Sequence, residues 1–122
     1  MDYESFRVVE SRIAPGVRFT VRKMSFARRM ELMERVREIG QRMEFLAAGD
    51  TAREKMDAAM ARGEIDRLYV RWGVQAIEGL YVDGEEATAD ALAQAGPEGL
   101  FREALALVRR ETGLDEAERK NC

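Results

Sequence analysis

The sequence predicts an α+β fold that is mainly α-helical with an N-terminal β-hairpin, in a small domain of four to five helices. Apolar residues alternate with polar ones at period two near the N-terminus, and they recur at helical spacing through most of the rest. Glycine, proline and capping residues divide the chain into segments of ordinary length. A length of 122 residues suits one domain over residues 1–122.

The hairpin is expected over about residues 6–23. Pro15 and Gly16 separate two apolar runs and suit a turn. The alternation places these apolar residues on one face: Phe6, Val8, Val17, Phe19 and Val21. Because two strands alone are marginal in water, we expect the first turns of the next helix to cover that face.

A first helix is expected over about residues 25–48, with Ser25 as its N-cap and Gly49 as its stop. One stripe recurs at spacings of four, three, four and three: Leu32, Val36, Ile39, Met43 and Leu46. This stripe is typical of a helix that packs on another helix.

A second helix is expected over about residues 51–78, because Thr51 and Glu54 form a capping-box pattern. Its first half is apolar through Met56, Ala59 and Met60. Beyond Gly63 the main stripe moves to the opposite side, through Ile65, Leu68, Tyr69, Trp72 and Ala76. Either the helix breaks near Gly63, or its second half lies between two neighbours, with Trp72 central.

The C-terminal third predicts a short extended segment at 79–82, a turn at Asp83-Gly84 and two further helices. Thr88 suits the cap of a helix over 88–95, and Pro97 suits the start of one over 97–112. The tail at 115–122 is polar.

The composition argues against catalysis. The chain has no histidine, and its single cysteine, Cys122, is the last residue. Nucleophilic triads, zinc sites and most proton shuttles need one of these residue types. The acidic residues Asp83, Glu85 and Glu86 lack the spacing of a calcium loop, and the glycines match no phosphate-binding pattern. We therefore expect no enzyme, no cofactor and no metal.

The N-terminus is acidic, unlike a signal peptide, and no apolar run is long enough to span a bilayer. We expect a cytoplasmic protein without a membrane partner.

Charge is distributed unevenly along the chain. Residues 1–42 hold ten Arg/Lys and six Asp/Glu, a net of +4, whereas residues 43–122 hold ten and seventeen, a net of −7. A candidate basic surface consists of Arg18, Arg22, Lys23, Arg28 and Arg29. Nucleic acid is one candidate partner for it. The chain's own acidic half, or an acidic protein, is the favoured one.

Five methionines follow the first two helices and form the candidate partner-binding surface: Met30, Met33, Met43, Met56 and Met60. Flexible thioethers fill cores, and they also adapt to varied apolar partners. The sequence leaves both interpretations open, a core or a groove for another protein's helix.

Several features in order resemble the tail assembly chaperones of long-tailed bacteriophages and prophages. Phe19-Thr20-Val21-Arg22-Lys23-Met24-Ser25 leads into a charged helix, and a helix around Trp72 precedes Leu80-Tyr81-Val82-Asp83-Gly84. Thr88, Gly96-Pro97-Glu98 and the ending Glu118-Arg119-Lys120-Asn121 follow. The resemblance carries no catalytic or ligand motif.

The resemblance implies a protein of the bacterial host cytoplasm that binds the tape measure protein, keeps it soluble and promotes tail tube assembly. Many members of the family are extended by a ribosomal frameshift, and Lys120-Asn121 is compatible with a slippery codon run. Two alternatives are a structural or connector protein of a phage particle and a small nucleic-acid-binding protein that uses the basic half. A homo-oligomer is also compatible with the sequence.

Overall fold

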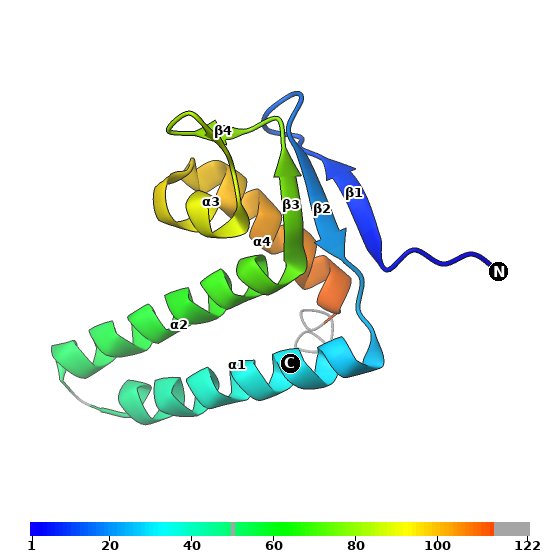
Figure 1. The fold of residues 1–122 in the computed structure, drawn as a ribbon. Helices are drawn as coiled ribbons and strands as arrows, with labels where there is room; N and C mark the ends of the chain where they lie inside the picture. The colour runs from blue at the N-terminus through cyan, green and yellow to red at the C-terminus, as the bar shows by residue number, and fades with distance from the viewer. Residues whose placement is uncertain (50, 114–122) are drawn as a thin grey trace. The chain divides into compact units, whose positions relative to one another are not determined.

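A computed structural model describes residues 1–49 and 51–113 of the chain (Figure 1). Its elements, in order, are β1 (Phe6–Glu10), β2 (Arg18–Arg22), α1 (Phe26–Ala47), α2 (Ala52–Gly73), β3 (Val74–Glu78), β4 (Tyr81–Val82), β5 (Glu85–Glu86), α3 (Ala89–Ala95) and α4 (Glu98–Thr112). The predicted class is confirmed: an α+β fold with four helices in the described part and an N-terminal hairpin. The predicted tail at 115–122, which includes Lys120 and Asn121, lies outside the described residues.

The chain forms two compact units. The first, which we call the sheet unit, comprises Met1–Met24 and Tyr69–Cys122. The second, which we call the helical hairpin, is Ser25–Leu68. The prediction of one domain over residues 1–122 stays a prediction.

The sheet unit contains an antiparallel sheet of three strands in the order β1-β2-β3. Val9 lies opposite Phe19, and Val8 lies opposite Thr20. Directly opposed residues share a face, so Val9 lies on the face of the buried Phe19. The prediction that Phe6 and Val8 join this face is wrong, since their side chains are 40% and 55% exposed. Alternation alone does not say whether Val8 or Val9 faces inward, because the pairing partner decides the phase.

The predicted helix over 51–78 is wrong in its last turn, because α2 ends at Gly73 and residues 74–78 form β3. Val74 and Ile77 are buried there. A bulge near Thr20 and Val21 shifts the register of β2 with β3. Pairing with β2 is a long-range interaction that outweighs the local helical pattern. At the junction, a Cβ on Gly73 would lie 2.5 Å from a Cγ atom of Val108, so this approach of α2 to α4 needs glycine.

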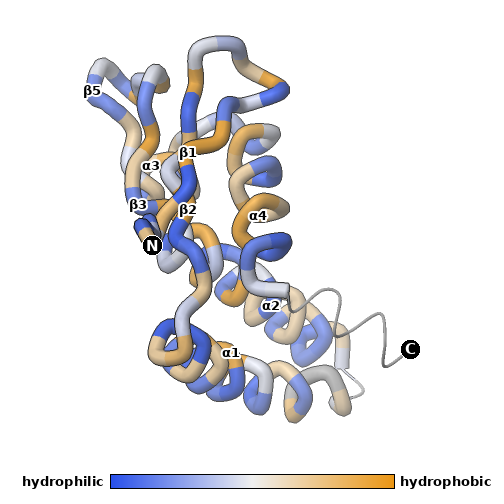
Figure 2. The backbone as a smooth tube through the Cα atoms, turned by 90° about the vertical axis from the view of Figure 1, so that its right-hand side faces the viewer, coloured by the Kyte–Doolittle hydropathy of each residue, from blue (hydrophilic) through white to orange (hydrophobic). Residues whose placement is uncertain are grey.

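The helix that contacts β2 within the sheet unit is α4, while α3 contacts β3. Figure 2 shows α4 running alongside the strands. Its buried residues are Leu100, Ala104, Leu105, Val108 and Thr112. The predicted cover of the hairpin was the first turns of the 25–48 helix. The cover found within this unit comes from α3 and α4, and the predicted cover by the first helix stays a prediction.

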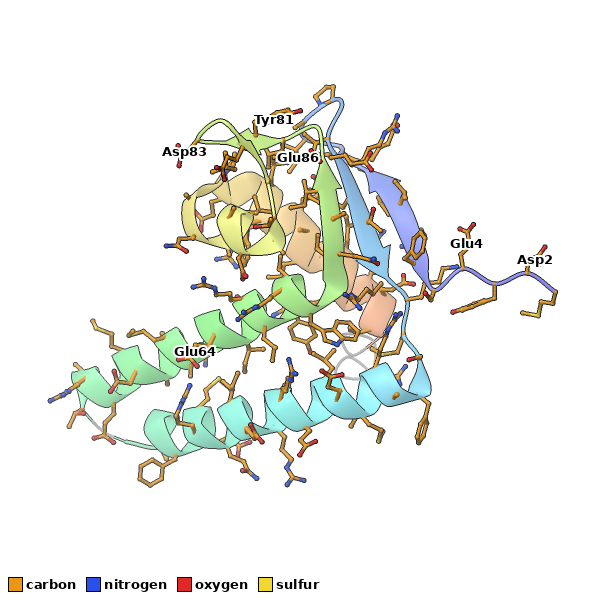
Figure 3. The ribbon with its side chains drawn as sticks, in the orientation of Figure 1. Asp2, Glu4, Glu64, Tyr81, Asp83 and Glu86 are labelled. Atoms are coloured by element: carbon orange, nitrogen blue, oxygen red, sulfur yellow. The ribbon has the colours of Figure 1, made fainter. Side chains whose placement is uncertain are left out.

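The C-terminal caps and turns follow the predictions closely. Asp83 and Gly84 both have positive φ, of 52° and 85°, in the turn between β4 and β5. Figure 3 labels Tyr81, Asp83 and Glu86 on this small hairpin. The Thr88 hydroxyl accepts a hydrogen bond from Ala91 N at 3.1 Å, so it is the N-cap of α3. Gly113, with φ of 70°, ends α4.

Within residues 1–49 and 51–113, no helix combines the length and the apolarity that crossing a membrane would require.

Candidate functional site

Helices α1 and α2 run antiparallel in the helical hairpin (Figure 1), and an ion pair between Arg42 and Glu64 joins them. Figure 3 labels Glu64 on α2. On α1, Leu32 is fully buried, and its stripe continues through three half-buried residues: Val36, Ile39 and Met43. The stripe predicted from spacing is therefore the least exposed side of α1 over these positions.

The inner side of α2 is not the side that carries Met56, Ala59 and Met60. Ala58 and Ala61 are buried at 3% and 1% exposure, and the same stripe continues through the half-buried Ile65 and Leu68. The predicted side, through Met56, Ala59 and Met60, is exposed. The helix also passes through Gly63 without a break. Of the two interpretations left open for Met56 and Met60, the core is excluded by their exposure, and two alanines occupy the inner side.

Four of the five candidate methionines are exposed. Met30 and Met33 on α1 are each 47% exposed, while Met56 and Met60 on α2 are 67% and 65% exposed. Phe26 on α1, at 82%, continues the spacing of Met30 and Met33 at intervals of four and three. Each helix therefore carries an exposed apolar stripe separate from its inner stripe. Met43 is the exception, because it belongs to the inner stripe of α1.

The candidate basic residues are distributed over both units. Arg18 and Arg22 share the face of β2 that lies away from Phe19, and Lys23 follows them. Arg18 pairs with Glu10 at 3.5 Å, and the Lys23 ammonium lies 5.0 Å from the centre of the Tyr3 ring.

The other two basic residues, Arg28 and Arg29, belong to the first turn of α1 in the helical hairpin. Both are half-buried and both interact with other groups. Four of the five basic residues, all except Arg22, therefore interact with other groups, which weakens the case for a phosphate-binding surface.

The acidic residues Asp83, Glu85 and Glu86 are exposed on the β4–β5 hairpin. No group of three or more potential metal-ligating side chains occurs in the part of the chain that the structure describes.

A groove of about 450 Å³ lies in the sheet unit between β1 and α4. Residues 7–10 and Arg12 line it from the strand side, and Glu103, Ala106, Leu107 and Arg110 line it from α4. One end is tied by Glu103, which accepts hydrogen bonds from the Ser11 hydroxyl at 2.5 Å and from Arg12 N at 2.7 Å. The other end is tied by Arg7, which pairs with Glu111 at 3.2 Å.

The sequence analysis did not predict this groove, because its two walls are distant in the chain. The hydrogen bonds that link them join Glu103 to residues 91 and 92 positions away. The local signal at Ser11 is a turn, in which its hydroxyl accepts from Ile13 N and Ala14 N. Nothing in that pattern indicates a partner on a distant helix.

Comparison with known proteins adds no relative, since no family model, no curated protein and no solved structure matches this chain.

Proposed function

We propose that the chain is a tail assembly chaperone of a long-tailed bacteriophage or prophage, which binds the tape measure protein in the host cytoplasm and promotes assembly of the tail tube. The single observation that carries the proposal is the exposure of Met30, Met33, Met56 and Met60 on the helical hairpin. The resemblance of the sequence to this family supplies the identity of the partner.

The physical argument concerns what a holding chaperone needs. Its client is a long protein with apolar helices, so the chaperone must offer apolar surface that adapts to many client sequences. Unbranched thioether side chains provide this adaptability. The hairpin combines them with exposed ion pairs such as Arg35 with Glu31, at 2.9 Å, which keep the same helices hydrated. Apolar residues outside the inner stripes are thus available to a partner helix.

The direct test is co-expression of the chain with the tape measure protein encoded by the same phage or prophage. With the natural chain, we expect the tape measure protein to stay in the soluble fraction and to co-purify with the chaperone. Substitution of Met30, Met33, Met56 and Met60 together by Gln should return it to the insoluble fraction. Glutamine has a helix propensity close to that of methionine, so the helices should persist.

The matched control replaces the same four methionines by Leu, which keeps the surface apolar and should preserve solubilisation. Circular dichroism and the urea midpoint should be alike in the Gln and Leu variants. A Gln variant that solubilises the tape measure protein as well as the natural chain would contradict the proposal.

A second measurement separates the chaperone from a connector of the phage particle. A chaperone should be absent from purified virions, whereas a connector should be present in a fixed copy number by mass spectrometry. Nucleic-acid binding would instead show as an affinity that falls steeply with salt.

A further inference from the structure

The outer edge of β1 is open. β1 is the first strand in the order β1-β2-β3, so it has a neighbour in the sheet on one side only. Ser11 N donates to Val17 O at 2.8 Å, and Lys23 N donates to Ser5 O at 2.9 Å. These bonds fix the alternation of the ladder, in which every second residue of β1 pairs with β2.

The residues between them, Phe6, Val8 and Glu10, therefore direct their backbone N–H and C=O groups away from β2. Within residues 1–49 and 51–113, no hydrogen bond reaches these groups. An edge of this kind is a template for another strand unless the protein blocks it. β1 contains no proline, no lysine and no bulge in its pairing with β2, and its charged residues are Arg7 and Glu10.

The groove beside this edge contains two arginines that have no acidic partner among residues 1–49 and 51–113. Its acidic residues are engaged, since Glu103 accepts from Ser11 and Arg12 N, and Glu10 pairs with Arg18. The guanidinium groups of Arg12 and Arg110 are exposed, and neither pairs with any residue in the described ranges. The groove is therefore complementary to an acidic ligand.

The two arginines lie toward opposite ends of the groove. Glu103 is tied to Ser11 and Arg12, and Glu111 is tied to Arg7, so α4 runs antiparallel to β1. Seven residues of helix from 103 to 110 span about 10 Å. Residues i and i+4 of an extended strand lie about 13 Å apart on one face. Two carboxylates at this spacing are within reach of the side chains of Arg12 and Arg110. A residue midway between the two carboxylates would face Ala106 and Leu107.

We propose that the groove between β1 and α4 binds an extended acidic segment of a partner protein, which adds to the edge of β1 as a fourth strand. Acidic residues at i and i+4 pair with Arg12 and Arg110, and an apolar residue at i+2 packs on Ala106 and Leu107. Main-chain hydrogen bonds supply affinity and alternate side chains supply specificity, as in other cases of strand addition. The site lies in the sheet unit, so it is independent of the proposed role of the methionines.

The test uses the full chain and a fluorescein-labelled peptide of sequence Thr-Glu-Thr-Val-Thr-Glu-Thr, with binding followed by fluorescence anisotropy. Arg12→Gln combined with Arg110→Gln should weaken binding roughly tenfold or more, because two charge-assisted hydrogen bonds are lost. The matched control is Arg37→Gln combined with Arg53→Gln, which removes two exposed arginines of the helical hairpin and should leave the affinity unchanged. The four-methionine Gln variant should also bind the peptide normally.

Strand addition can also be tested by changing the peptide and leaving the protein unaltered. N-methylation of one alternating set of peptide residues, either Thr or Glu and Val, should abolish binding, while methylation of the other set should be tolerated, because only one set directs its N–H groups at β1. Equal effects of the two sets would overturn the proposal. Failure of the natural chain to bind the peptide would overturn it too, as would a dimer in sedimentation that excess peptide does not dissociate.

Discussion

The two units of the chain differ in which apolar side chains they bury. In the sheet unit, large residues such as Phe19, Ile77 and Val108 are at most 2% exposed. In the helical hairpin, the buried positions of α2 are the alanines Ala58 and Ala61, while four methionines and two phenylalanines are between 47% and 82% exposed. The sheet unit therefore has the composition of a core that sustains a fold. The hairpin buries Leu32 on α1 and two alanines on α2, while its exposed methionines and phenylalanines form an adaptable apolar surface that suits a partner.

The largest effect is expected at Phe19, which is fully buried. Phe19→Ala should lower the free energy of unfolding by about 3–5 kcal/mol, because it leaves a cavity in the core of the sheet unit. Urea unfolding, followed by the fluorescence of the single tryptophan, measures this change. Phe26→Ala in the hairpin, at a site 82% exposed, should change it by no more than about 0.5 kcal/mol. Equal costs at the two sites would break the comparison.

Substitutions at two glycines of α2 test the comparison between the two units further. Gly73→Ala should destabilise the chain by about 1–3 kcal/mol, because the new methyl group overlaps the side chain of Val108. Gly63→Ala meets nothing within 4 Å and should stabilise the helical hairpin by about 0.4–1 kcal/mol. Thermal melting of both variants gives the sign of the change in stability directly. A stabilising Gly73→Ala would show that α2 does not approach α4 closely.

The smallest effects concern ion pairs. A double-mutant cycle on Arg42 and Glu64, whose side chains are 53% and 54% exposed, should give a coupling free energy of about 0.2–1 kcal/mol. The same cycle on Arg7 and Glu111 should give a larger coupling, because the Glu111 side chain is only 19% exposed. Urea unfolding of the single and double alanine variants measures both coupling free energies. A larger coupling in the hairpin would reverse the expected order.

Local signals predicted much of this fold. The caps and stops at Thr88, Gly84 and Gly113 depend on neighbouring residues only, and the structure has them where the pattern predicts them. The phase of β1 and the strand β3 depend on β2, which is distant in sequence. Neither the choice between Val8 and Val9 nor the end of α2 at Gly73 is decided by local propensity.

The candidate site was likewise predictable only where it depends on residues close together in the sequence. Spacing predicted that Leu32, Val36 and Ile39 share the inner side of α1. On α2 the hydrophobic pattern left open whether Met56 and Met60 belong to a core or to a partner groove, and both are exposed. The buried residues on the inner side of α2 are Ala58 and Ala61. The groove between β1 and α4 depends on contacts between opposite ends of the chain, so no local pattern indicates it.

The order of the elements has one more consequence. The helical hairpin leaves the sheet after β2 and returns at β3, and these two strands are direct neighbours, with Val21 opposite Val74. Its two points of attachment are thus those of an ordinary β-turn connection, enlarged into an insertion. Lengthening or shortening both helices by matching numbers of turns would leave the strand ladder intact. The fold is in this sense modular, because the length of the inserted helices is independent of the pairing of the strands on either side of them.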